Sequence, residues 1–153
     1  MLLASRRVGI SNAVINPLKS TLYMPLTKIS APKHLPSSMV KALAEAVQDG
    51  LVKTCNVPPN DLFQLISRFE AEEIVLDPHF GGVSRSSSAC IAEIVFLIGR
   101  TDDQKRALFR HISARAVQAG FRADDIMVAL VENSRMDWSL GHGVAYADQH
   151  SKA

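Results

Sequence analysis

The sequence has few of the residues from which several common kinds of site are built. Only two of its 153 residues are cysteines, Cys55 and Cys90, and they show no paired spacing. The five histidines also lack the spacing of metal ligands. No apolar run approaches the roughly 20 residues that a membrane-spanning helix needs. We therefore expect a reduced, intracellular protein without a disulfide framework, a metal site or a membrane span.

Acidic residues are missing from the beginning of the chain. Residues 1–24 contain Arg6, Arg7 and Lys19 but no Asp or Glu, whereas residues 25–153 carry 14 Lys and Arg against 15 Asp and Glu. The net charge of +2 therefore comes from the first residues, and the rest has a net charge of −1. A nucleic-acid-binding surface would need a basic stripe, so no nucleic-acid partner is expected.

This basic beginning has three possible interpretations. Residues 1–23 contain serines and no clean hydrophobic periodicity, which fits a mitochondrial targeting segment, a wrongly assigned upstream start codon, or a disordered extension. Either of the first two would create a new N-terminus near Met24 and Pro25. We therefore divide the chain into a leader, residues 1–24, and a domain, residues 25–153. A false start predicts a cytoplasmic protein, our leading expectation, and a transit peptide predicts a mitochondrial one.

The first half of the domain is predicted to be a strand–helix–strand unit. Residues 25–30 are a short strand candidate, and a helix is expected to begin at 36–38 and to end at 56–60, where consecutive prolines cannot continue it. A second strand follows at 62–69. The apolar residues that recur on one face of the helix at helical spacing are Val40, Leu43, Ala44, Val47 and Leu51.

The second half repeats this order of elements. A nearly continuous apolar run predicts a strand over residues 89–98, buried on both faces. Thr101 and Gln104 form a capping box that begins a helix, and Gly120 ends it. A final strand is expected at 126–131.

The two halves correspond at an offset of 64 residues, with a turn-rich loop at 77–88 between them. The offset places Pro25 on Ala89 and Asp61 on Asp125. Right-handed crossovers would make the two strands within each unit parallel. We expect an α+β fold of two tandem β-α-β units, in which a four-stranded sheet carries both helices on one face.

Four motifs resemble those of the tautomerase superfamily, in particular its malonate semialdehyde decarboxylase branch. They are Met-Pro-Leu at 24–26, Val-Pro-Pro-Asn-Asp at 57–61, Gly-Arg-Thr-Asp-Asp-Gln-Lys at 99–105, and Val-Glu-Asn-Ser at 131–134 with Asp-Trp-Ser-Leu-Gly at 137–141. The motifs follow the family's order, and the match covers about residues 24–146. The resemblance implies a homotrimer, no metal or organic cofactor, and an N-terminal proline that performs acid–base chemistry.

Pro25 is the residue on which the implied activity depends. Within a chain its nitrogen is an amide without useful basicity, but at a free N-terminus it is a secondary amine, and α-amino groups titrate near about 7.7–8.0. Such an amine could move a proton beside a carbonyl group or form an imine with it. The alternative is that Pro25 only begins a strand, where its missing N–H is tolerated.

Arg100 is the candidate anchor for a substrate carboxylate. It lies where a buried strand ends and a capped helix begins, and its guanidinium could bind a carboxylate through two parallel hydrogen bonds. A solvated arginine at the end of an element is the alternative. In the decarboxylase a second arginine lies two residues earlier, whereas this chain has Ile98. The resemblance therefore favours tautomerisation over decarboxylation.

Three further residues correspond to the family's site. Asp61 matches an acidic residue that activates water or polarises the substrate carbonyl, although an aspartate also suits the turn in which it lies. Trp138 and Leu140 resemble an apolar wall beside the proline, and they could equally pack in the core or in a subunit interface.

Glu93 is an acid within an apolar strand, and it either pairs across a subunit contact or marks an edge of the pocket.

The sequence thus predicts a cofactor-independent enzyme that acts on a small oxo acid. Keto–enol tautomerisation is the leading activity, followed by decarboxylation of a 3-oxo acid and hydration of a 3-haloacrylate. Two other classes remain: a non-catalytic trimeric scaffold or binding module with the same fold, and a ferredoxin-like small-molecule sensor. The sensor does not account for the motifs around Arg100 and Trp138.

Overall fold

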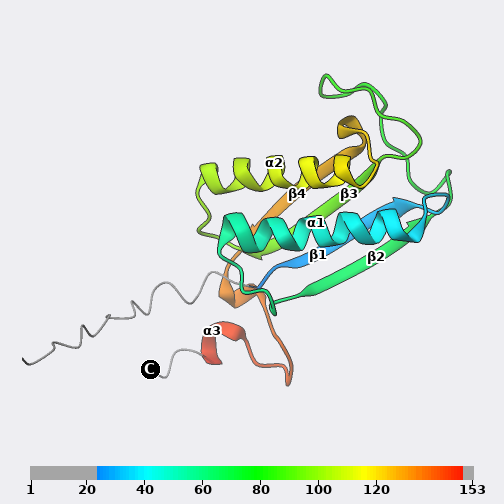
Figure 1. Ribbon diagram of the computed structural model, residues 1–153. Coiled ribbons are helices and arrows are strands. Elements are labelled where there is room, and N and C mark those ends of the chain that lie inside the picture. The colour runs from blue at the N-terminus through cyan, green and yellow to red at the C-terminus, as the bar shows by residue number, and fades with distance from the viewer. Residues whose placement is uncertain (1–23, 150–153) are drawn as a thin grey trace, which may run out of the picture.

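The computed structural model describes residues 24–149, so the expected leader lies almost entirely outside the described residues. Two helices lie side by side on one face of a four-stranded sheet (Figure 1). The α+β architecture predicted from the sequence is therefore confirmed. Among the described residues, none of the helices combines the length and hydrophobicity needed to cross a bilayer.

The first unit consists of β1 (Leu26–Pro32), α1 (Ser37–Cys55) and β2 (Phe63–Phe69). The apolar face predicted for α1 is buried against the sheet and α2. The helix ends where the sequence predicted, because Asn56 adopts a left-handed conformation with φ of 57° and donates its backbone N–H to the Leu51 carbonyl.

The second unit consists of β3 (Cys90–Leu97), α2 (Asp102–Gln118) and β4 (Ile126–Asn133). The predicted capping box is confirmed, since the Thr101 hydroxyl accepts from the Gln104 backbone N–H and the Gln104 side chain accepts from the Thr101 N–H. This cap fixes the start of α2 directly after the loop that carries Arg100.

The strand order β2-β1-β3-β4 brings together segments that are distant in the sequence. The two strands of each unit are parallel, as predicted, and the two units meet through the antiparallel pair of β1 and β3. One end of the sheet therefore contains the start of β1, the start of β2, the end of β3 and the end of β4. We call this end, which holds residues 24–26, 61–63, 97–100 and 133, the site end.

The segment after β4 contains regular structure that was not predicted from the sequence. It forms the 3-10 turn η3 (Arg135–Asp137), an isolated bridge between Ser139 and Ala145, and the short helix α3 (Tyr146–Gln149). Ser134 and Asp137 cap η3 reciprocally. In the view of Figure 1, the segment lies below the site end of the sheet.

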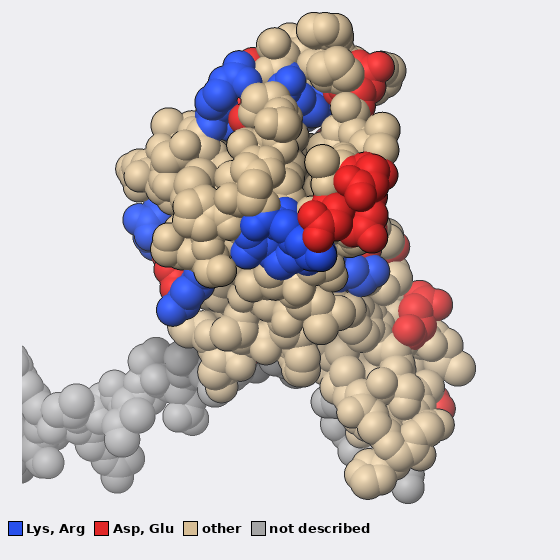
Figure 2. Space-filling view, turned by 90° about the vertical axis from the view of Figure 1, so that its right-hand side faces the viewer, with Lys and Arg blue, Asp and Glu red and all other residues tan. Residues whose placement is uncertain are grey.

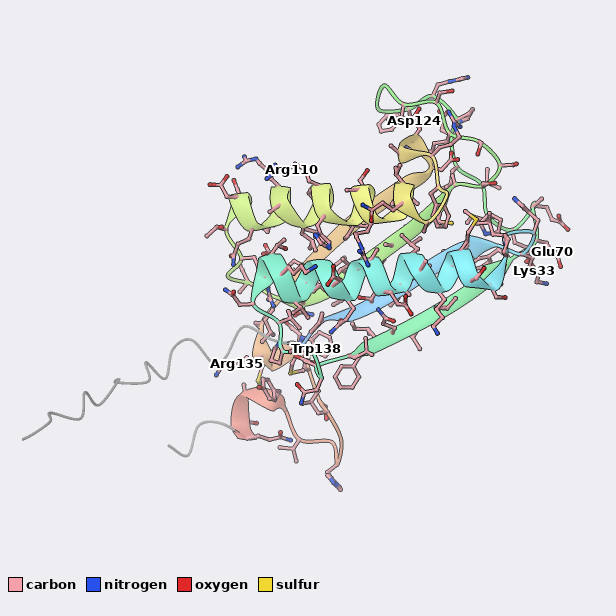
Figure 3. All side chains as sticks on the ribbon, viewed as in Figure 1. Lys33, Glu70, Arg110, Asp124, Arg135 and Trp138 are labelled. Atoms are coloured by element: carbon pink, nitrogen blue, oxygen red, sulfur yellow. The ribbon has the colours of Figure 1, made fainter. Side chains whose placement is uncertain are left out.

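The opposite end of the sheet carries charges of both signs. Lys33 and Glu70 lie there together (Figure 3), 2.6 Å apart. Figure 2 views this side of the molecule and shows acidic side chains next to basic ones rather than a continuous basic stripe. Charges of both signs therefore lie side by side on this face.

Candidate active site

Four of the five predicted site residues belong to segments that meet at the site end of the sheet. Pro25 immediately precedes β1, Asp61 precedes β2, and Arg100 follows β3. Trp138 follows β4 after one short turn, and Figure 3 shows it at this end, away from Lys33 and Glu70. The mixed sheet gathers these residues because β1 runs antiparallel to β3 and parallel to β2.

Pro25 is almost completely buried, and the residue before it contacts Asp61. Met24 is 7% exposed and has a φ of 79°, an uncommon conformation for a residue with a side chain. Its backbone N–H donates to Oδ2 of Asp61 at 2.8 Å. A chain that retains Met24 therefore uses one oxygen of Asp61 for a main-chain hydrogen bond.

The turn that carries Asp61 is fixed on both sides. The Asp61 N–H donates to the Pro58 carbonyl at 3.0 Å, and its own carbonyl accepts from Nε2 of Gln48 on α1 at 3.2 Å. Its backbone thus has the turn role expected from the sequence, while its carboxylate points toward the residue before Pro25.

Arg100 is a buried cation whose hydrogen-bonding capacity is only partly used. The side chain is 5% exposed, and its guanidinium carbon lies 4.6 Å from the centre of the Phe96 ring. Nη1 donates to the Leu97 carbonyl at 2.5 Å, but Nε and Nη2 are buried without a hydrogen-bond partner. Buried donors are nearly always satisfied in folded proteins, so these two nitrogens are exceptional.

The electrostatic surroundings of Arg100 explain how it stays charged. Burial lowers the pKa of its guanidinium, while the Cys55 side chain and, more weakly, Glu132 and Asp61 act to raise this pKa. Arginine remains protonated at neutral pH under such shifts. Arg100 therefore presents a positive charge in a largely desolvated position, with Asp61 close enough to influence it.

Trp138 and Leu140 differ in how firmly they are held. The indole Nε1 of Trp138 donates to Oδ1 of Asn133 at 2.7 Å, and its carbonyl accepts from the Tyr146 N–H at 2.8 Å. Leu140 lies before the turn at Gly141, and 53% of its side chain is exposed. Asn133 belongs to the motif at 131–134, but no role was predicted for it from the sequence, because no local spacing connects it to Trp138.

Glu93, which the sequence left undecided, belongs to the open face of the sheet. Its carboxylate lies 2.7 Å from the Lys28 ammonium, and the two residues are cross-strand partners of β3 and β1. It therefore pairs within the chain rather than lining the site end. No group of three or more potential ligands gathers into a metal site among the described residues.

Comparisons with known proteins identify the family. Residues 61–141 match the family described as tautomerase enzyme. "Probable tautomerase YusQ" of Bacillus subtilis (strain 168) is 30% identical over 123 residues, which cover 80% of this chain and 97% of that protein.

Solved structures agree with this relationship. The FG41 malonate semialdehyde decarboxylase inhibited by 3-bromopropiolate superimposes with a TM-score of 0.73 at 29% identity, covering 81% of this chain and 95% of that one. A second malonate semialdehyde decarboxylase, studied for its decarboxylase and hydratase activities, gives a TM-score of 0.72 at 30% identity, covering 81% of this chain and 97% of that one. As the motifs indicated, the chain belongs to the tautomerase superfamily and has malonate semialdehyde decarboxylases among its relatives.

Proposed function

We propose that this superfamily enzyme is a cofactor-independent tautomerase of small oxo acids, with Pro25 as its base and Arg100 as its carboxylate anchor. The observation that carries the proposal is the pair of unpartnered nitrogens on Arg100. Buried donors without hydrogen-bond partners are costly, whereas a bound carboxylate would supply two charge-assisted hydrogen bonds. The empty hydrogen-bonding positions of Arg100 therefore suit an anionic substrate.

Pro25 would move the proton once its nitrogen is free. Its burial disfavours the ammonium form and keeps a fraction of the amine neutral near pH 7. With the carboxylate on Arg100, the amine would take the hydroxyl proton of the enol and return a proton to the neighbouring carbon. The ammonium formed between these transfers would lie beside Asp61, whose carboxylate is released when Met24 is removed.

The direct test uses protein that begins at Pro25, as established by intact mass. Phenylenolpyruvate and malonate semialdehyde are assayed separately, by loss of the enol and by release of carbon dioxide. We expect phenylenolpyruvate to be the better substrate. If the protein turns over neither compound, the proposal is contradicted.

Ile98 provides the second prediction, because it stands where the decarboxylase has an additional arginine. Its side chain is 63% exposed, so a longer polar side chain fits there without repacking the core. We expect Ile98→Arg to raise decarboxylation of malonate semialdehyde and to lower kcat/KM for phenylenolpyruvate, each by about tenfold.

Ile98→Met is the matched control, since it preserves the apolar character at similar length. It should leave the ratio of the two activities close to that of the wild type. Equal changes in both activities for the arginine variant would show that residue 98 does not influence substrate choice.

The assembly is proposed to be a homotrimer. One similar protein, the Q0 fused 4-OT, forms a symmetric trimer, and at 17% identity with a TM-score of 0.66 it shares the fold. The sheet face opposite the helices is also left uncovered by residues 24–149, the part of the chain that the structure describes. Exposed apolar side chains at strand positions include Leu65, Met127 and Val131.

A non-catalytic binding module is the alternative, and the contact between Met24 and Asp61 favours it. A mature protein that keeps Met24 would have neither a basic nitrogen at Pro25 nor a free Asp61 carboxylate. The intact mass of the protein from its native source separates the two. A mass beginning at Pro25 supports the enzyme, and the mass of the complete chain supports the module.

A further inference from the structure

Asn133 connects two apolar residues of the site end through its main chain and its side chain. It is the last residue of β4 and pairs with Leu97, the last residue of β3. Its carbonyl accepts from the Ile98 N–H at 2.8 Å, and its side-chain Oδ1 accepts from Nε1 of Trp138 at 2.7 Å. A single residue thus fixes the start of the loop that leads to Arg100 and the orientation of the indole.

The side chains of Ile98 and Trp138 differ in chemistry from Arg100, the proposed carboxylate anchor. Arg100 offers unpartnered donors, whereas Ile98 and Trp138 present mostly hydrocarbon. The indole N–H is the only polar atom of the Trp138 side chain, and Asn133 already accepts its hydrogen bond. The ring is therefore available for apolar contact but is not free to donate to a substrate.

We infer that Asn133 is a positioning residue whose side chain holds the indole of Trp138 in place, so that the site prefers oxo acids with an apolar substituent. The inference rests on the proposed function for its substrate, and it goes beyond it in assigning how the substituent is selected. Loss of the Oδ1 acceptor would remove the hydrogen bond of the indole, because the other hydrogen bonds of Trp138, to Arg135 and Tyr146, are made by its backbone.

The substrate pair that tests this role is phenylenolpyruvate and enolpyruvate, the same enol acid without the ring. We expect Asn133→Ala to raise KM for phenylenolpyruvate about tenfold with little change in kcat, since one partly buried hydrogen bond and the orientation of the Trp138 ring are lost. KM for enolpyruvate should stay close to that of the wild type. Asn133→Asp retains an oxygen acceptor and is expected to restore much of the discrimination.

Trp138 also gives a readout that requires no turnover, because it is the only tryptophan in the chain. In Asn133→Ala its emission should shift to longer wavelength and acrylamide should quench it more strongly, whereas Asn133→Asp should resemble the wild type. Unchanged emission and quenching in Asn133→Ala would overturn the inference, as would an equal rise in KM for both enols.

A second variant removes the donor of the hydrogen bond between Trp138 and Asn133. Trp138→Phe keeps an aromatic ring but removes the N–H, so it should weaken discrimination between the two enols even if Asn133→Ala does not fold. Wild-type discrimination in Trp138→Phe would overturn the inference. A wild-type protein inactive on both enols would instead contradict the proposed function, and the fluorescence of Asn133→Ala would still decide the role of Asn133.

Discussion

Protein that begins at Pro25 is expected to ketonise phenylenolpyruvate about 10²–10⁴ times faster than the same protein acetylated at Pro25, the usual contribution of positioned proton transfer. Acetylation converts the secondary amine into an amide, which has no lone pair available for a proton. It adds only a small group, so it separates the chemistry of the nitrogen from obstruction by a longer leader. The measurement is kcat/KM for the two forms, each verified by intact mass.

The pH dependence gives an independent signature of the same group. A general base acts in its neutral form, so kcat/KM should rise with pH as the Pro25 ammonium loses its proton. The midpoint reports the pKa of the Pro25 amine, which burial acts to lower and the neighbouring Asp61 carboxylate acts to raise. This ascending limb should disappear in the acetylated protein.

Pro25→Ala at the new N-terminus is the matched control. It retains an amine, now primary, and should keep part of the activity that acetylation removes. An acetylated protein that is as active as the free amine would contradict the assignment of Pro25 as the base, whatever the activity of the alanine variant.

Replacing Arg100 by methionine should lower kcat/KM for phenylenolpyruvate about 10²–10³-fold. Two charge-assisted hydrogen bonds to a carboxylate are together worth about 3–4 kcal/mol, and every 1.4 kcal/mol is a factor of ten. Arg100→Lys keeps the charge but loses the planar pair of donors, so its activity should fall between those of the wild type and Arg100→Met. Steady-state kinetics on the three proteins tests this order.

The free energy of unfolding should change little in Arg100→Met, whereas the loss of an arginine that stabilises the fold would lower it. Methionine can still pack on Phe96, and it removes a buried charge whose Nε and Nη2 have no partner. Against this, the Leu97 carbonyl loses its donor. We expect the free energy of unfolding of Arg100→Met to stay within about 1 kcal/mol of the wild type or to increase.

Denaturant unfolding of Arg100→Met therefore distinguishes an arginine that binds substrate from one that stabilises the fold. A loss of several kcal/mol would identify it as a residue that the fold requires. Phenylpyruvate should raise the unfolding temperature of the wild type but not of Arg100→Met, because a ligand stabilises only the protein that binds it.

The order of elements could be predicted because each depends on local chemistry. The capping box at Thr101 and the end of α1 at Asn56 were visible in the sequence, since both arise from side chains and turn formers within a few residues. The predicted boundaries of β3 were less accurate. The apolar run continues through Ile98, yet regular pairing with β4 ends at Leu97, because hydrophobicity alone does not mark where a ladder stops.

The contacts of the candidate site were harder to predict than its residues. Resemblance pointed to Asp61 and Arg100, but no sequence pattern shows that Nε and Nη2 of Arg100 lack partners, because this depends on packing from several elements. β4 extends beyond the predicted end at Val131, so the pairing of Asn133 with Leu97 was not predicted. The assignments of Pro25, Asp61, Arg100, Trp138 and Leu140 to catalysis and binding stay predictions.

The antiparallel pairing of β1 and β3 has a consequence for how many sites one chain can hold. It turns the second unit around, so Ala89 and Asp125, the counterparts of Pro25 and Asp61, lie at the far end of the sheet. A polypeptide has a single amino terminus, and Ala89 can never possess a free amine while the halves remain joined. Asp125 instead holds the loop before β3, because its two oxygens accept from the Ser86 N–H at 2.7 Å and from the Ser86 hydroxyl at 2.6 Å. Joining the halves thus confines any chemistry of this kind to one pole of the subunit.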